Sequence, residues 1–159
     1  MAVEKWTAGA GVGLTWTAIF GAGADLNSMA NASSVMSSTG DIANDTALDI
    51  FADLSVQLGS ATWASPSMIS VFAYPLNGDG TTYGDNQLTA GTQAAKVPAP
   101  QFWVGNINFP NGAAAAFGTL ERIIMPPGKF RFVIQNNGGV AMAATGNAVQ
   151  YRTYNRSVA

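Results

Sequence analysis

Residues 48–58, with the sequence LDIFADLSVQL, decide the fold class of this chain. Every even-numbered residue in the segment is apolar, and every odd-numbered residue except Phe51 is polar. A repeat of two is the pattern of a β-strand that turns one face to a core and the other to water. The segment therefore predicts a strand with Asp49 and Asp53 on a solvated face.

The same alternation returns in residues 129–135, where Phe130, Phe132 and Ile134 are expected to face inward. Residues 68–76 are apolar on both faces and predict a central strand. Turn-forming residues separate these segments, as in Pro126-Pro127-Gly128. Further strands are expected at residues 14–20, 102–109, 120–125 and 149–154. Short strands separated by turns predict an all-β protein. We expect a jelly-roll-like β-sandwich formed by residues 41–159 of a single domain.

Residues 1–40 differ from the rest because they are rich in Gly, Ala, Ser and Asn. We expect an N-terminal arm with a first strand, packed on the domain or on a neighbouring subunit. A short helix beginning at Asp25 would place Leu26, Met29, Ser33 and Met36 on one face. Aromatic side chains dominate interface hot spots, so Trp6, Trp16 and Phe20 are the expected contacts with another subunit.

The composition excludes several classes of chemistry. The 159 residues include no His and no Cys, which removes His-dependent triads, thiolate nucleophiles and nearly all zinc sites. Only 10% of the residues are charged, a low share that suits a surface partly covered by other protein. The formal net charge of −2 argues against binding to nucleic acid or to an anionic membrane. The first residues lack a signal-peptide pattern, so we expect cytoplasmic synthesis.

Charge is distributed unevenly along the chain. Residues 1–90 hold eight of the acids and only Lys5 as a base, whereas residues 91–159 hold six bases and only Glu121 as an acid. The two halves could neutralise each other inside one subunit. As an alternative, the acidic surface of one subunit could meet the basic surface of its neighbour.

Neither the carboxylates nor the glycines form a recognisable site. Asp49 and Asp53 would lie about 13 Å apart along a strand, farther than the carboxylate pairs of glycosidases. The loop of residues 77–86 offers oxygen atoms on Asn77, Asp79 and Asp85 but lacks the spacing of an EF-hand. The glycines of residues 9–13 do not match a nucleotide-binding motif. We expect no catalytic residue, no metal site and no cofactor.

Exposed aromatic residues give one alternative. Trp63, Trp103 and Tyr151 could form a platform on which sugar rings stack, as in a carbohydrate-binding or receptor-binding module. A hydrolase that uses carboxylates alone is a weaker alternative, since it needs two acids brought together in a cleft.

Two segments carry a resemblance to a known class of protein. Residues 41–54 (DIANDTALDIFADL) and 126–147 (PPGKFRFVIQNNGGVAMAATGN) resemble stretches of the jelly-roll decoration proteins on the capsids of tailed bacteriophages. The likeness extends over residues 41–154, is weak between residues 81 and 100, and consists of packing and turn motifs.

The resemblance implies a non-enzymatic structural protein of the virion. Such a protein would bind the major capsid protein on the outer capsid surface, would assemble as a homo-oligomer, commonly a trimer, and would stabilise the shell by mass action. The alternative within the same setting is a carbohydrate-binding or receptor-binding module of a tail fibre or spike. For the decoration protein, the N-terminal arm up to about Phe20, with Trp6 and Trp16, would contact neighbouring subunits or the capsid. Deletion of residues 1–20 would therefore abolish capsid attachment and leave a folded sandwich.

Overall fold

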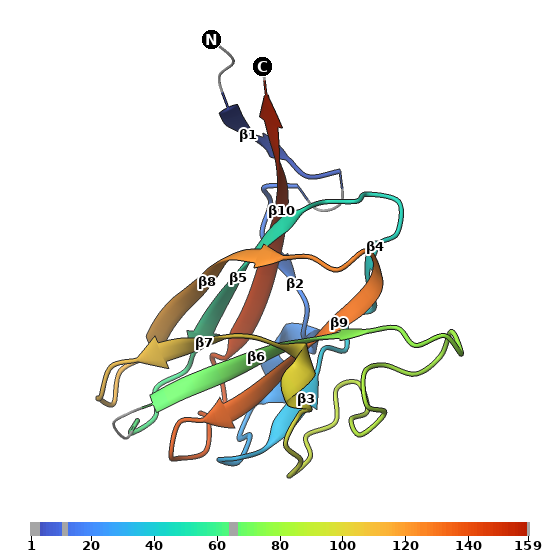
Figure 1. Ribbon diagram of the computed structural model, residues 1–159. Helices are drawn as coiled ribbons and strands as arrows, with labels where there is room; N and C mark the ends of the chain where they lie inside the picture. The colour runs from blue at the N-terminus through green and yellow to red at the C-terminus, as the bar shows by residue number, and fades with distance from the viewer. Residues whose placement is uncertain (1–3, 11–12, 64–66, 159) are drawn as a thin grey trace.

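Two antiparallel sheets packed against each other form a β-sandwich, which confirms the all-β prediction (Figure 1). The structure is a computed structural model in which residues 4–10, 13–63 and 67–158 are described. The first sheet has the strand order β1-β10-β5-β8, and β2 also pairs with β10; its strands are β1 (Glu4–Ala8), β2 (Thr17–Ala18), β5 (Phe51–Leu58), β8 (Ala116–Ile124) and β10 (Ala148–Val158). The second has the order β3-β9-β6-β7, and β4 also pairs with β9; its strands are β3 (Ser34–Met36), β4 (Ile42–Asn44), β6 (Ser67–Pro75), β7 (Trp103–Phe109) and β9 (Gly128–Asn137).

The main core lies between the two sheets and follows the alternation of the sequence. On β5, Leu54, Val56 and Leu58 are fully buried, and on β9 the inward residues are Phe130, Phe132 and Ile134. The inward faces predicted for these two segments are therefore confirmed. Among the described residues no helix is long and apolar enough to cross a membrane.

A second, smaller core covers the outer face of the second sheet. The connection of residues 76–99 folds back over this face, where Tyr83 and Leu88 pack with Phe72, Tyr74 and Val133. This cover explains why residues 68–76 are apolar on both faces. The strand they form, β6, has β9 on one side and β7 on the other, as its central position required.

The prediction of a solvated face for β5 is wrong. The strand begins at Phe51, so Leu48 and Ile50 precede it and are exposed, whereas Asp49 and Asp53 are 2% and 3% exposed. Asp49 is covered because its carboxylate accepts hydrogen bonds from the backbone N–H of Ala10 and the side-chain amide of Asn155.

The helix expected from Asp25 onward is also absent. The segment contains the short 3₁₀ helix η1 (Gly21–Leu26) and then β3. Ser28 and Ala32 have φ angles of 55° and 63°, and this left-handed backbone interrupts any helix between them. The four residues assigned to the helix face, Leu26, Met29, Ser33 and Met36, are nevertheless all buried.

The first and last strands form a ribbon that projects from the sandwich, and Glu4 lies opposite Val158 at its far end (Figure 1). Lys5 lies opposite Ser157 and Trp6 opposite Arg156 in this antiparallel pair. β5 pairs with β10 only up to Tyr154, so beyond that residue β10 has β1 on one side and, within the described residues, no strand on the other. Trp6 and Arg156 of the ribbon line a hollow together with Arg122 of β8.

Candidate functional site

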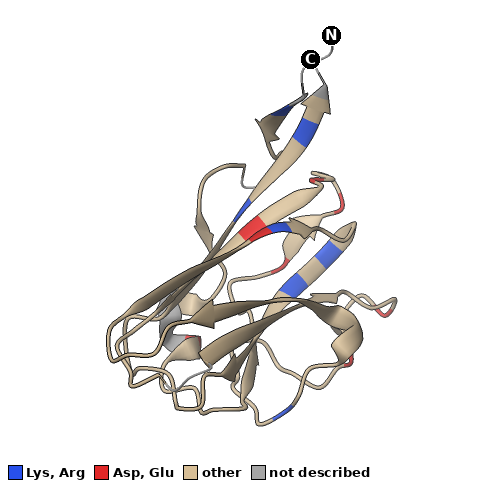
Figure 2. Cartoon of the chain, turned by 60° about the vertical axis from the view of Figure 1, so that its left-hand side comes forward, with Lys and Arg blue, Asp and Glu red and all other residues tan. Residues whose placement is uncertain are grey.

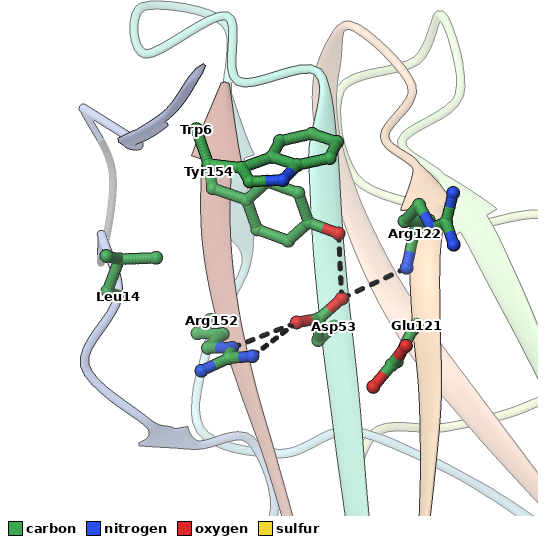
Figure 3. Close-up of a pocket in the computed structure, with 7 residues that line it drawn as sticks. All are labelled: Trp6, Leu14, Asp53, Glu121, Arg122, Arg152 and Tyr154. Carbon is green, nitrogen blue, oxygen red and sulfur yellow. Dashed lines mark hydrogen bonds and ion pairs between the residues drawn. The ribbon is translucent and has the colours of Figure 1, made fainter. Parts of the chain in front are cut away.

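The outer face of the first sheet is hollowed beneath the ribbon (Figure 3). The hollow has a volume of about 410 Å³ and brings together the four strands β1, β5, β8 and β10 and the segment before β2. Its lining residues are Trp6, Leu14, Asp53, Glu121, Arg122, Arg152 and Tyr154. A second hollow of about 260 Å³ shares Trp6 and Arg122 with it and is lined also by Lys5 and Arg156.

A buried carboxylate organises this site. Arg152 donates to Oδ2 of Asp53 through Nε at 2.9 Å and through Nη2 at 2.8 Å. The hydroxyl of Tyr154 and the backbone N–H of Arg122 donate to Oδ1 at 2.9 and 3.0 Å (Figure 3). Because both oxygens accept hydrogen bonds and one cation lies beside them, the charge of Asp53 is compensated although the residue is buried.

The backbone of Arg122 is held in an unusual conformation by this carboxylate. Ala52 lies opposite Ile123 and Leu54 opposite Leu120, so Glu121 and Arg122 together face Asp53, which is the arrangement of a β-bulge. Arg122 has a φ of 56°, a region that costs energy for a residue with a side chain. Its hydrogen bond to Asp53 offsets part of that cost and fixes the two side chains of the bulge at the rim of the hollow.

Aromatic rings form the other wall. Trp6 packs edge-to-face against Phe51 and Tyr154, with ring centroids 5.9 and 5.2 Å apart, and remains 56% exposed. Burial, followed by the hydrogen bond to Asp53 and the charge of that carboxylate, raises the pKa of the Tyr154 hydroxyl to about 12. Tyr154 is therefore a neutral hydrogen-bond donor at ordinary pH.

Positive charge gathers around the ribbon. Figure 2 shows basic residues on both strands of the ribbon and a basic residue next to an acidic one on the sheet below it. Lys5, Arg122 and Arg156 all line the smaller hollow with Trp6. Glu121 at the larger hollow is the remaining carboxylate of the lining beside Asp53.

A separate apolar groove of about 430 Å³ lies where β7 begins and β8 ends. Trp103 and Ile124 line it and are 54% and 76% exposed. Pro126 and Pro127, from the second segment that carries the bacteriophage resemblance, form part of its wall. The groove combines exposed apolar side chains with a rigid turn.

The three residues expected to contact another subunit have different environments. Phe20 is 1% exposed and belongs to the main core, so it is not a surface contact; this part of the prediction is wrong. Trp16 is partly buried, with the guanidinium of Arg152 4.7 Å from its ring centroid. Trp6 is the one of the three that is more than half exposed.

The three residues expected to form a sugar platform do not form one. Trp63 belongs to the main core at 3% exposed, and Tyr151 belongs to the same core cluster. Trp103 is exposed in the groove and donates its indole N–H to Asn106. Burial removes the ring faces of Trp63 and Tyr151 from a ligand, so the prediction is wrong for these two residues.

The acids of residues 77–86 serve the loop itself. The carboxylate of Asp79 accepts hydrogen bonds from the backbone N–H groups of Thr81 and Thr82 and from the Thr82 hydroxyl, which lower its pKa to about 2. Asp85 accepts from the Tyr74 hydroxyl and from the N–H of Gln87. No cluster of three or more acids is placed to hold a metal ion within the described ranges.

Two ion pairs between described residues join the acidic part of the sequence to the basic part. Asp41 pairs with Arg131 at 2.9 Å and Asp53 pairs with Arg152. For these four residues the charges neutralise within one subunit.

Sequence analysis missed Glu121, Arg122 and Arg152 as site residues, because nothing in the local sequence signals a bulge or a partner about a hundred residues away.

No family model, no curated protein and no solved structure matches this chain.

Proposed function

We propose that this chain is a non-enzymatic structural protein of a bacteriophage virion, which decorates and stabilises the outside of the capsid by binding the major capsid protein. The observation that carries the proposal is the apolar groove. Trp103 and Ile124 are exposed there beside Pro126 and Pro127, which belong to the segment that resembles decoration proteins. Exposed apolar surface of this kind is typical of a face that another protein covers.

The strand order supports a jelly roll. If β1 and β2 are counted as one interrupted strand, and β3 and β4 as another, the sandwich has eight strands. The first then pairs with β10, the second with β9, β5 with β8, and β6 with β7, each pair antiparallel and nested inside the one before. Nested pairing of this kind matches the double Greek key of jelly rolls, which are common in viral capsid proteins.

The two segments that carry the resemblance also lie together. β4, from the first segment, pairs with β9, from the second. The side-chain amide of Asn44 donates to the carbonyl oxygens of both Asp49 and Pro126. The motifs thus form one structural unit next to the groove, which supports treating them as a single feature.

The environment of Asp53 supports a non-enzymatic role. Asp53 and Glu121 line one hollow, which is the arrangement that a carboxylate-dependent hydrolase would need. Both oxygens of Asp53, however, already accept hydrogen bonds from Arg152, Tyr154 and Arg122. A nucleophile or a general base needs a free lone pair directed at the substrate, and Asp53 offers none.

The experiment is quantitative mass spectrometry of density-gradient fractions from a lysate in which the gene is expressed from its native genome. Decoration predicts hundreds of copies per particle, in a fixed ratio to the main shell protein and on the particle surface. A few copies per particle would move the proposal to a fibre or spike, and absence from particles would overturn it.

A matched pair of variants tests the groove. Ile124→Asp places a charge in the groove, and Val97→Asp places the same charge at a residue that is 74% exposed and is not among the groove's lining residues. Both proteins should fold, since both side chains are on the surface. We expect Ile124→Asp to lower attachment to undecorated particles at least tenfold and Val97→Asp to leave it unchanged; equal attachment of both variants would contradict the role of the groove.

A further inference from the structure

The hollows beneath the ribbon carry an inference that does not rest on the proposed function. Together they join an exposed aromatic ring, several cations and a carboxylate in adjoining spaces of about 410 and 260 Å³. The larger hollow by itself has the volume of a typical small-molecule site. Neither the resemblance nor the groove accounts for this combination.

Trp6 offers a fixed apolar surface. Its edge-to-face contacts with Phe51 and Tyr154 hold the indole over the sheet, and more than half of it stays exposed. Figure 3 shows the ring at the rim of the hollow, above Tyr154 and Asp53. A rigid ring in this position can accept the flat, weakly apolar face of a sugar ring with little loss of side-chain entropy.

The charges around the ring favour an anion. Arg152 is matched by Asp53 at the floor of the hollow. The other charged side chains of the lining are three cations, Lys5, Arg122 and Arg156, and one carboxylate, Glu121. A carboxylate ligand would gain charge-assisted hydrogen bonds from the guanidinium groups.

The bulge positions two of these groups. Arg122 and Glu121 are adjacent residues of β8, and the N–H of Arg122 is held by Asp53. In Figure 3 Arg122 and Glu121 lie on one side of Asp53 and Arg152 lies on the other. The site thus presents a cation and a hydrogen-bond acceptor from a fixed backbone. The positive φ of Arg122 is a strained conformation of the kind that persists at binding sites.

We propose that these hollows bind a carboxylated sugar, either a uronic acid or a sialic acid within a larger glycan. The sugar ring stacks on Trp6, its carboxylate pairs with Arg122 and the neighbouring cations, and its hydroxyl groups donate to Glu121. A simple anion would use neither the indole nor Glu121, and an apolar peptide would use none of the cations.

The test is calorimetric titration of the purified chain with three acidic probes, namely trigalacturonate, a hyaluronan tetrasaccharide and sialyllactose. Maltotriose and lactose are the neutral controls, and sodium sulfate and a short polyglutamate peptide test the anion alone. We expect saturable binding of at least one acidic sugar and none of the neutral ones. If no acidic sugar binds, or if sulfate or polyglutamate binds as tightly as the sugar, the proposal is overturned.

Variants locate the site. Trp6→Ala and Arg122→Gln should each weaken binding of the acidic sugar at least tenfold, since each removes one of the two groups that the ligand uses. Trp103→Ala is the control for Trp6, because Trp103 is similarly exposed in the separate groove. Lys129→Gln is the control for Arg122, since Lys129 is an exposed cation on the other sheet. Unchanged binding by Trp6→Ala, with thermal melting showing each variant folded, would contradict the assignment.

Discussion

Asp53 and its partners show what one residue does for the outer face of the first sheet. The carboxylate neutralises Arg152, orients the Tyr154 hydroxyl and holds the backbone of the bulge at Arg122. Three separate segments of β5, β8 and β10 therefore depend on a side chain that alternation alone assigns to water.

Asp53→Asn should be destabilising. The amide keeps the shape but loses the negative charge, and its NH₂ group cannot accept from its present donors. Leaving buried donors unsatisfied costs roughly 1–3 kcal/mol, which we expect as the loss in free energy of unfolding measured by urea denaturation. Asp45→Asn, at an exposed residue, should change stability by less than about 0.5 kcal/mol. Equal stabilities of the two variants would contradict the role assigned to Asp53.

The raised pKa of Tyr154 should make the folded protein less stable at alkaline pH. Its pKa is raised to about 12 in the folded chain, against 10 for an unperturbed tyrosine. Between pH 10 and 12 the unfolded chain releases this proton and the folded chain retains it, so the folded state binds more protons and stability falls as the pH rises. Tyr74, also raised to about 12, acts in the same direction.

The measurement is the urea midpoint at a series of pH values from 9 to 12. The wild-type midpoint should be constant at the lower end and fall toward the upper end. Tyr154→Phe should be less stable at pH 9, because the bond to Asp53 is lost, and should show a shallower decline. Parallel curves for the two proteins would show that Tyr154 is not responsible.

At the scale of elements, residues 13–40 belong to the sandwich and do not form a detachable arm. β2 pairs with β10, and Ile19 and Phe20 lie in the main core. Deletion of residues 1–20 should therefore unfold the protein, contrary to the expectation from the sequence that a folded sandwich remains.

Phe20→Ala tests this point without a deletion. Removing a buried phenyl ring costs about 3–5 kcal/mol, a large part of the stability of an ordinary domain. Leu14→Ala, at an exposed residue of the same segment, should cost less than about 0.5 kcal/mol. Chemical denaturation gives both values, and a loss below 1 kcal/mol for Phe20→Ala would mean that this segment packs loosely.

The elements predicted correctly are those long enough for a repeat to be visible. β5 and β9 span eight and ten residues, and their inward-facing residues follow the alternation of the sequence. β1, β3 and β4 were missed because strands of three to five residues show too little of the pattern. The buried residues of the segment after Asp25 were found, but turns with positive φ produced their spacing and no helix was involved.

The candidate site lay beyond sequence reasoning for a different reason. Asp53 is separated from Arg152 and Tyr154 by 99 and 101 residues, and only the pairing of β5 with β10 brings them together. A polar residue can be buried when such partners exist, and alternation gives no information about them. The prediction that Trp63 and Tyr151 are exposed was wrong for the same reason, since burial of an aromatic ring depends on the whole fold.

At the scale of the whole molecule, the pairing of the first strand with the last closes the chain on itself. β1 and β10 are antiparallel, and Glu4 lies opposite Val158 at the far end of their ribbon (Figure 1). In the linear chain this contact closes a loop that includes nearly all of the sequence, which is costly in entropy. A covalent connection to β10 would remove this entropy cost and would therefore stabilise the pairing of β1 more than that of any other described strand.

A circular permutant tests this arrangement. A short Gly/Ser linker joins the present ends, and the chain is opened between Ala113 and Ala114, in an exposed loop that connects β7 with β8. No strand pair is cut, so the thermal midpoint should stay within about 4 °C of the parent, the shift expected from a change of about 1 kcal/mol. Hydrogen exchange should slow at the amides of β1, because the linker makes its pairing local. A permutant opened between Ala52 and Asp53 interrupts β5 and should not fold; if it melts like the first permutant, the central role of β5 in the sandwich is contradicted.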